Sequence, residues 1–330
     1  MSVAERLDRL QRRHQGAGFP IAVVYKLFDD AGTFLAAIIT YYGFVSLFPI
    51  LLLFSTVLGF LLQGNPDLQQ RLLHSALSEF PVIGAQLGEP KRLGGGIAGL
   101  VVGIVGAVYG GLGVGQAIQF ASNTAWAVPR NKRPNPLKAR GRSLLLLATM
   151  GLTVLVTFVL SALGSSAAAF GEQIGVGLHV AFTLVAVVLN AGVFIVGFRL
   201  ATARDLTVRQ ILPGALTAGV IWQLLQSFGG VYVGHVVKSA SLINSVFALV
   251  LGLLAFLYLA AFGVVLATEI NVVRVNHLYP RALLTPFTDD VDLTPGDERT
   301  YTDAAKAQRT KGFQHIDVTF DGERSDDADA

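Results

Sequence analysis

The chain contains no cysteine among its 330 residues, and charged residues make up only 14% of it. Without thiols it can form no disulfide, thiolate metal site, iron–sulfur cluster or cysteine nucleophile. An ordinary globular chain carries about 25% charged residues, so the shortage of charge argues against a soluble protein. We expect no cleavable signal peptide, because the first fifteen residues are charged and lack an apolar stretch.

Patterns of catalysis and metal binding are missing as well. The sequence has no Walker lysine motif, no GxSxG turn and no HExxH, and its six histidines follow no ligand spacing. The sequence therefore predicts no enzymatic activity, no cofactor and no metal ion. A nucleic-acid partner is not expected either, because the most basic segment has only Trp126 as a nearby aromatic residue.

What the sequence does have is a large apolar fraction, 52%, gathered into long runs. A bilayer core about 30 Å thick is crossed by roughly 20 apolar residues in a helix. Six stretches are long enough, which predicts an all-α polytopic membrane protein with a bundle of six transmembrane helices. These spans are residues 36–62, 97–120, 143–170, 176–198, 211–233 and 245–273.

The connections between the spans indicate how the chain is oriented. Sixteen Lys and Arg residues lie before the first span, in alternate connections and after the last span, against four in the opposite connections. Positive charge favours the cytoplasmic side, so both termini are predicted to be cytoplasmic. Membrane lipids are then the expected partners.

Three further segments surround the spans. Residues 1–35 should form cytoplasmic or interfacial helices, with the part from Phe19 to Phe34 lying against the inner face as an interfacial N-terminal helix. Asn65-Pro66-Asp67 begins an external amphipathic helix. Residues 36–284 make up the transmembrane domain. Residues 285–330 carry five basic and twelve acidic residues, which predicts an acidic, mostly disordered cytoplasmic tail.

Polar side chains accumulate near the inner ends of the first, second and last spans. Since polar groups facing lipid are costly, we expect them to line a polar cavity that opens toward the cytoplasmic leaflet. Glu269 is the only acid within the six spans, and its alternative role is structural, capping a loop or pairing with Arg274 or a connection arginine. The candidate cavity residues are Tyr41, Tyr42, Ser46, Gln116, Asn123, Glu269 and Asn271.

Three other features suggest how the helices pack and what they meet. Glycines recur at four-residue spacing in the second span, which favours close helix packing and leaves a homo-oligomer seam open as the alternative. Pro49 predicts a kink in the first span. The connection after the second span is either a topogenic loop or a binding site for anionic lipid headgroups. The headgroup candidates are Arg130, Lys132, Arg133, Arg140 and Arg142.

Two stretches resemble the YihY/BrkB family of bacterial inner-membrane proteins, over roughly residues 25–280. One is AAIITYYGFVSLFP at 36–49, with paired aromatic residues followed by Ser-Leu-Phe-Pro. The other begins at Leu212-Pro213-Gly214, passes Trp222 and ends in ATEIN at 267–271, where the family usually reads GAELN. The resemblance implies a multi-pass protein of the bacterial inner membrane.

The resemblance and the polar residues together give the functional expectation. The leading hypothesis is transport or flipping of an amphipathic, lipid-like envelope molecule through the inner-leaflet cavity. The alternative is a non-transporting membrane scaffold for an envelope complex. The ribonuclease BN label once given to the family is rejected, because no cluster of acids or histidines is available for hydrolytic metal ions.

Overall fold

The computed structural model describes residues 15–61, 96–167, 172–239, 242–283 and 291–320, together with Asp8, Gln11 and Thr285. Regular structure in these ranges is entirely helical, which confirms the predicted all-α class. The predicted external helix after Asn65 lies outside the described residues.

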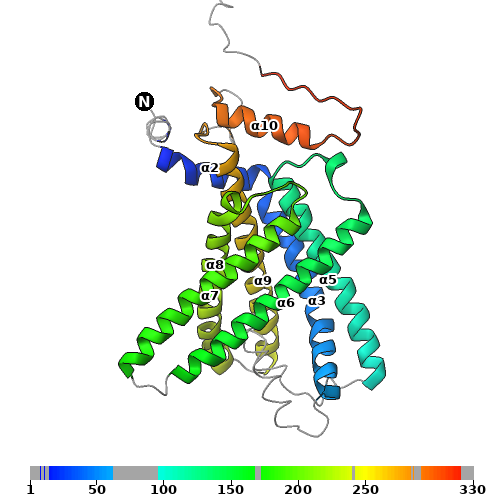
Figure 1. The fold of residues 1–330 in the computed structure, drawn as a ribbon, viewed down its shortest axis with the longest axis vertical. Coiled ribbons are helices and arrows are strands. Elements are labelled where there is room, and N and C mark those ends of the chain that lie inside the picture. Colours follow the sequence, from blue (N-terminus) through cyan, green and yellow to red (C-terminus); the bar gives the residue numbers. More distant parts are fainter. Residues whose placement is uncertain are drawn as a thin grey trace, which may run out of the picture.

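Six helices of 30 to 35 residues form the body of the described chain and alternate in direction (Figure 1). Each overlaps one predicted span. Their bounds are α3 Gly32–Leu61, α5 Gly96–Ala125, α6 Pro136–Ala167, α7 Glu172–Ala201, α8 Val208–Ser239 and α9 Leu242–Asn276. Three segments of the described chain are long and apolar enough to cross a membrane, namely Gly103–Ala125, Thr183–Ala201 and Val250–Asn276. The full count of six spans stays a prediction.

A shorter helix, α2 (Gln15–Asp29), precedes the bundle and lies across one end of it (Figure 1). The sequence predicted one helix from Phe19 to Phe34, but the chain turns at Ala31, whose φ is 53°. Residues 32–34 therefore belong to α3 instead. The helix α3 continues through Pro49, and the kink predicted there stays a prediction.

The prediction of disorder after residue 285 is wrong for Pro295–Ala307, which forms helix α10. Thr294 and Asp297 make a reciprocal capping box, and Pro295 stands at the helix start. These local signals outweigh the acidic composition of the segment. The helix α10 lies over the same end of the bundle as α2 (Figure 1).

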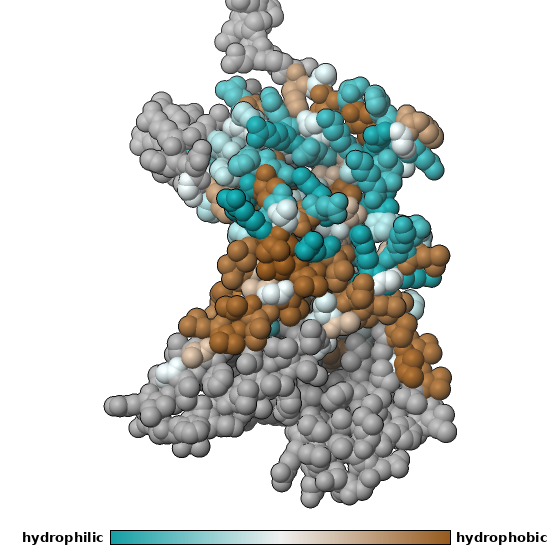
Figure 2. Space-filling view, viewed as in Figure 1, coloured by the Kyte–Doolittle hydropathy of each residue, from teal (hydrophilic) through white to brown (hydrophobic). Residues whose placement is uncertain are grey.

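The two ends of the described molecule differ in polarity. Hydrophilic residues gather around α2, α10 and the neighbouring connections, and a hydrophobic band follows directly below them (Figure 2). We call the first region the polar end. Five alanines of the helices that meet there have no exposed surface, which lets the backbones approach closely. They are Ala22, Ala36, Ala201, Ala215 and Ala267.

The glycines of α5 make room for both neighbouring helices. A methyl group added at Gly110 would meet Ser46 of α3, and one added at Gly115 would meet Ser143 of α6. This is the intramolecular packing that the four-residue spacing predicted. A homo-oligomer seam on the same span stays a prediction.

Replacing Gly110 or Gly115 by alanine is expected to lower the stability of the bundle. The new Cβ would lie 2.5 Å from Ser46 Cβ or 2.6 Å from Ser143 Cβ, well inside the optimal carbon–carbon separation of about 3.5–4.0 Å. Such overpacking costs about 1–3 kcal/mol. Thermal unfolding of the purified protein in detergent measures the effect.

Gly192→Ala is the matched control, since nothing lies within 4 Å of a Cβ built there. Alanine at this helical position is expected to leave the melting temperature unchanged or slightly raised. Equal melting temperatures for Gly110→Ala and Gly192→Ala would show that α3 and α5 are not in close contact at Gly110.

Candidate functional site

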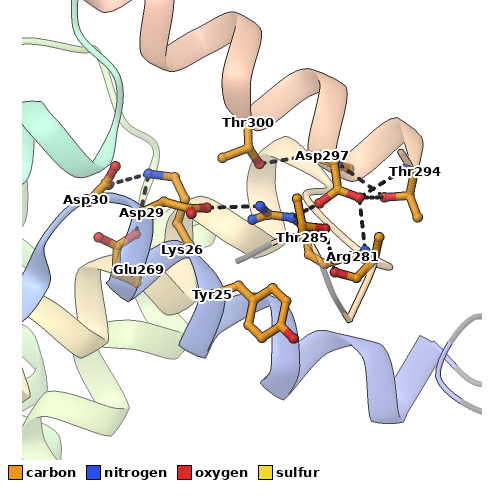
Figure 3. A network of polar contacts seen from close by, with 12 residues as sticks. Tyr25, Lys26, Asp29, Asp30, Glu269, Arg281, Thr285, Thr294, Asp297 and Thr300 are labelled. Carbon is orange, nitrogen blue, oxygen red and sulfur yellow. Dashed lines mark hydrogen bonds and ion pairs between the residues drawn. The ribbon is translucent and has the colours of Figure 1, made fainter. Parts of the chain in front are cut away.

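A lysine is buried where α2 crosses the end of the bundle. Lys26 is 4% exposed, and its Nζ donates hydrogen bonds to Asp30 Oδ2 and, at 3.3 Å, to the carbonyl oxygen of Ala125 at the end of α5. The same Nζ lies 3.9 Å from Glu269 Oε2 of α9 (Figure 3). The side chain therefore connects α2 with two helices of the bundle.

Glu269 is fully buried. The sequence offered Arg274 as a partner, but Arg274 instead donates to the carbonyl oxygen of Arg209, and the cation beside Glu269 is Lys26. Sequence reasoning took Lys26 as one of the inner positive charges and as an interruption of the apolar segment Phe19 to Phe34, but it assigned no partner to this lysine and so missed the pair. The available signal was that Lys26 interrupts an otherwise apolar part of the segment, a pattern typical of a paired charge. Lys26, Asp30 and Glu269 are called the acid–base cluster below.

Burial and charge act against each other in the acid–base cluster. Burial alone disfavours the ammonium form of Lys26, but the carboxyl groups of Glu269 and Asp30 outweigh it and raise the pKa of Lys26 above its ordinary value. Burial also raises the pKa of the Asp30 carboxyl, and Lys26 offsets only part of the rise. Lys26 is therefore held as a cation, whereas Asp30 has an increased tendency to bind a proton.

A second buried cation, Arg281, lies beside the acid–base cluster. Its Nη2 lies 2.9 Å from Asp29 Oδ2 of α2, and its Nε lies 2.5 Å from Asp297 Oδ1 of α10. Its guanidinium group also lies over the rings of Tyr25 and Tyr301. Asp29 and Asp30 are adjacent in sequence but pair with different cations, and Asp29 lies between the two groups in Figure 3.

Arg281 therefore fastens three segments that are far apart in the sequence. Asp297 accepts hydrogen bonds from the backbone N–H groups of Ala282 and Thr294 in addition to its pair with Arg281. The helix α10 is thereby anchored to the chain that follows α9. Past α10, the carbonyl oxygen of Arg309 accepts a bond from the N–H of Asn131 in the basic connection.

The other candidate cavity residues lie in separate surroundings. Tyr42 and Ser46 pack against the α5 glycines Gly113 and Gly110. Asn123 Oδ1 accepts from the N–H of Ala203 at 2.8 Å, and Asn271 Oδ1 accepts from the N–H of Gly214 at 2.8 Å. These two asparagines each fix a different contact between helices.

Tyr41 and Gln116, by contrast, face outward. Tyr41 is 62% exposed and Gln116 is also exposed. The described contacts thus do not join the seven candidates into one hydrogen-bonded group, and a role of each in substrate binding stays a prediction.

The five basic candidates after α5 also differ in their surroundings. Arg130, Lys132 and Arg140 are exposed. Arg133 lies over the Phe120 ring and donates to the carbonyl oxygen of Val128, while Arg142 donates to the carbonyl oxygen of Thr202. An approaching anion would therefore meet the three exposed side chains, Arg130, Lys132 and Arg140. A short 3₁₀ helix, η2 (Arg130–Lys132), holds two of them.

Within the described ranges, no group of three or more His, Asp or Glu residues is arranged to hold a metal ion. The contacts that the structure describes at the site are hydrogen bonds and ion pairs of its charged side chains.

Comparison with known proteins identifies the family. The family model described as "Virulence factor BrkB" matches residues 23–287, which is most of the chain. No curated protein and no solved structure gives a significant match. The chain belongs to the BrkB family, which confirms the resemblance inferred from the two sequence stretches.

Replacing Arg281 by methionine is expected to cost about 3–5 kcal/mol of unfolding free energy, because the carboxylate of Asp297 would remain buried without its cation. Loss of the same contact should free α10 from the bundle. The melting temperature and the rate of proteolytic cleavage within residues 291–320 measure the two effects.

Arg140→Met removes the same charge from an exposed position and serves as the control. If both variants melt and are cleaved alike, Arg281 does not fasten α10.

Proposed function

We propose that this BrkB-family membrane protein transports or flips an amphipathic, lipid-like envelope molecule across the bacterial inner membrane. In this proposal the polar end lies in the cytoplasm, so that α2 and α10 cover the cytoplasmic mouth of a six-span bundle. The protein acts without a cofactor or a metal ion, and we expect it neither to cleave RNA nor to catalyse another reaction.

The observation that carries the proposal is the acid–base cluster between α2 and α9. Removing charged groups from water costs several kcal/mol per ion, and apolar side chains of similar size would often hold two helices at least as well. A buried pair that joins a surface helix to the bundle is thus better suited to a contact that can open and close. Opening would expose Glu269 and Lys26 to the cytoplasm, as alternating access requires.

The basic residues of the polar end support a substrate with an anionic headgroup. Six exposed basic residues lie in the connections after α5 and α7 or near the ends of α6, α7 and α8, and hydrophilic residues gather at this end of the molecule, next to the hydrophobic band (Figure 2). Each is worth about 1 kcal/mol of attraction near an anionic leaflet. They would gather such lipids beside α2. The set is Arg130, Lys132, Arg140, Arg199, Arg204 and Arg209.

Tyr41 and Gln116 suggest where a headgroup could move. The contacts of Ser46 with Gly110 and of Tyr42 with Gly113 fix how α3 and α5 run past each other. This register places Tyr41 and Gln116 at comparable depth, and both are exposed. Polar groups on an outward face favour a path along the surface of the bundle, with the lipid tails remaining in the bilayer. They replace the enclosed cavity as the proposed route.

The alternative function, a scaffold for an envelope complex, would use the exposed side of α10. That helix is anchored to the polar end by Arg281 and so presents a fixed surface to a partner. A scaffold does not require Glu269 to become exposed or to change its charge. Replacing Glu269 should therefore impair transport and leave a scaffold function intact, which separates the two functions experimentally.

Glu269→Gln is expected to slow lipid movement without unfolding the protein, because glutamine keeps the shape of the side chain but cannot carry charge or release a proton. The purified protein is reconstituted into vesicles that contain fluorescent phosphatidylglycerol, and dithionite quenching reports transfer from the inner leaflet. We expect the variant to be at least ~10-fold slower, the effect of about 1.4 kcal/mol on a barrier.

Glu298→Gln changes the same residue type at an exposed position of α10 and should retain the wild-type rate. Wild-type vesicles no faster than protein-free ones would overturn the flipping activity for this lipid class. Equal rates for Glu269→Gln and wild type would exclude Glu269 from it.

A further inference from the structure

Glu269 lacks a hydrogen-bond donor. Neither of its carboxyl oxygens has a hydrogen-bond partner, although the side chain has no exposed surface. Lys26 cannot fill this role, since its Nζ bonds to Asp30 and to the Ala125 carbonyl and lies 3.9 Å from Glu269, beyond hydrogen-bond length. An ionised carboxylate in this position would be strongly penalised.

The charges around Glu269 do not balance if every acid is ionised. Arg281 is already paired with two carboxylates: its Nη2 lies 2.9 Å from Asp29 Oδ2, and its Nε lies 2.5 Å from Asp297 Oδ1. In the part of the chain that the structure describes, Lys26 is then the single cation paired with the two remaining carboxyl groups, Asp30 and Glu269. One of the two carboxyl groups is in excess.

The described charged groups farther from Glu269 do not supply a cation that would balance the excess carboxyl group. Asp303 of α10 adds a further acid that interacts electrostatically with Lys26, and its own cations are Lys306 and Arg204 of the α7–α8 connection. Beyond Lys26, the described charged groups that act most on Glu269 are Asp30, in the turn after α2, and Asp29 of α2. The buried apolar residues of the bundle helices include Ala36 of α3 and Ile211 and Ala215 of α8, and α5 contributes the Ala125 carbonyl oxygen that accepts from Lys26.

The two carboxyl groups meet at the same atom, the Nζ of Lys26. Asp30 and Glu269 lie within hydrogen-bond reach of one another, and both point toward Lys26 in Figure 3. Two carboxylates this close cannot both be ionised without a large repulsion, and such pairs commonly hold one proton between them. A proton on Glu269 would be donated to the Asp30 carboxyl group, while Asp30 Oδ2 accepts from Lys26.

We propose that Asp30 and Glu269 form a proton-binding site in which the two carboxyl groups share one proton beside Lys26. The proton resides on Glu269 and satisfies the otherwise unpaired carboxyl group. Exchange with solvent runs through Asp30, whose side chain is 9% exposed, whereas Glu269 has no exposed surface. The site goes beyond the transport proposal and does not depend on it.

Infrared difference spectroscopy of the detergent-purified full chain tests the site directly. The probe is the proton itself: the carbonyl stretch of a protonated carboxyl group is distinct from the carboxylate bands and shifts in heavy water. At neutral pH the wild type should show one such band that Glu269→Gln removes. Glu298→Gln, an exposed control of the same residue type, should retain it. A wild-type spectrum identical to that of Glu269→Gln would overturn the proposal.

Asp30→Asn provides a second test that does not depend on the folding of Glu269→Gln. The protonated band should weaken or disappear, because Glu269 is then the one carboxyl group left to balance Lys26 and no carboxyl group is in excess. A band unchanged in intensity and frequency would show that the proton does not depend on Asp30 and is not shared. A protein that shows the expected bands but moves no lipid would contradict only the transport proposal.

Discussion

The need to neutralise a lysine that α2 carries into the bundle governs the polar end of this protein. An unpaired ammonium group in such surroundings would be deprotonated or would keep the helix away from the bundle. Lys26 is 4% exposed and satisfied by Asp30, Glu269 and the carbonyl oxygen of Ala125. The position of α2 across the bundle therefore depends on a carboxyl group from the opposite end of the sequence.

Arg281 is a second buried cation that must be paired with carboxylates, and it lies between α2 and α10. This second cation joins Asp29 of α2 to Asp297 of α10, so the adjacent aspartates Asp29 and Asp30, at the end of α2 and in the turn after it, connect the bundle with the C-terminal helix. A change of charge at Glu269 would thus alter the electrostatic interactions of α2 directly, and those of α10 through Asp29 and Arg281. The coupling would run through a chain of ion pairs. Because these side chains are buried, each has few other partners with which it could pair.

Some of this could be predicted from the sequence and some could not. The long apolar runs predicted the helices, because length and hydropathy are local properties, and the 36–49 and 267–271 stretches predicted the family. Depth along a helix was predictable, but the direction of a side chain around it was not, which is why Tyr41 and Gln116 proved to face outward. The pairing of Lys26 with Glu269 spans most of the chain and follows from no local pattern. For α10, composition was given more weight than the capping signal at Thr294 and Asp297.

The absence of cysteine allows the position of α2 to be measured directly. Spin labels on cysteines placed at the exposed positions Val24 of α2 and Leu259 of α9 report one distance distribution by pulsed electron resonance. The account predicts a single narrow distribution in the otherwise wild-type protein, and a second, longer component when Lys26→Met is added. Lys132→Met, at an exposed position, should add none. An unchanged distribution in the Lys26→Met protein would contradict the claim that this lysine holds α2 against the bundle.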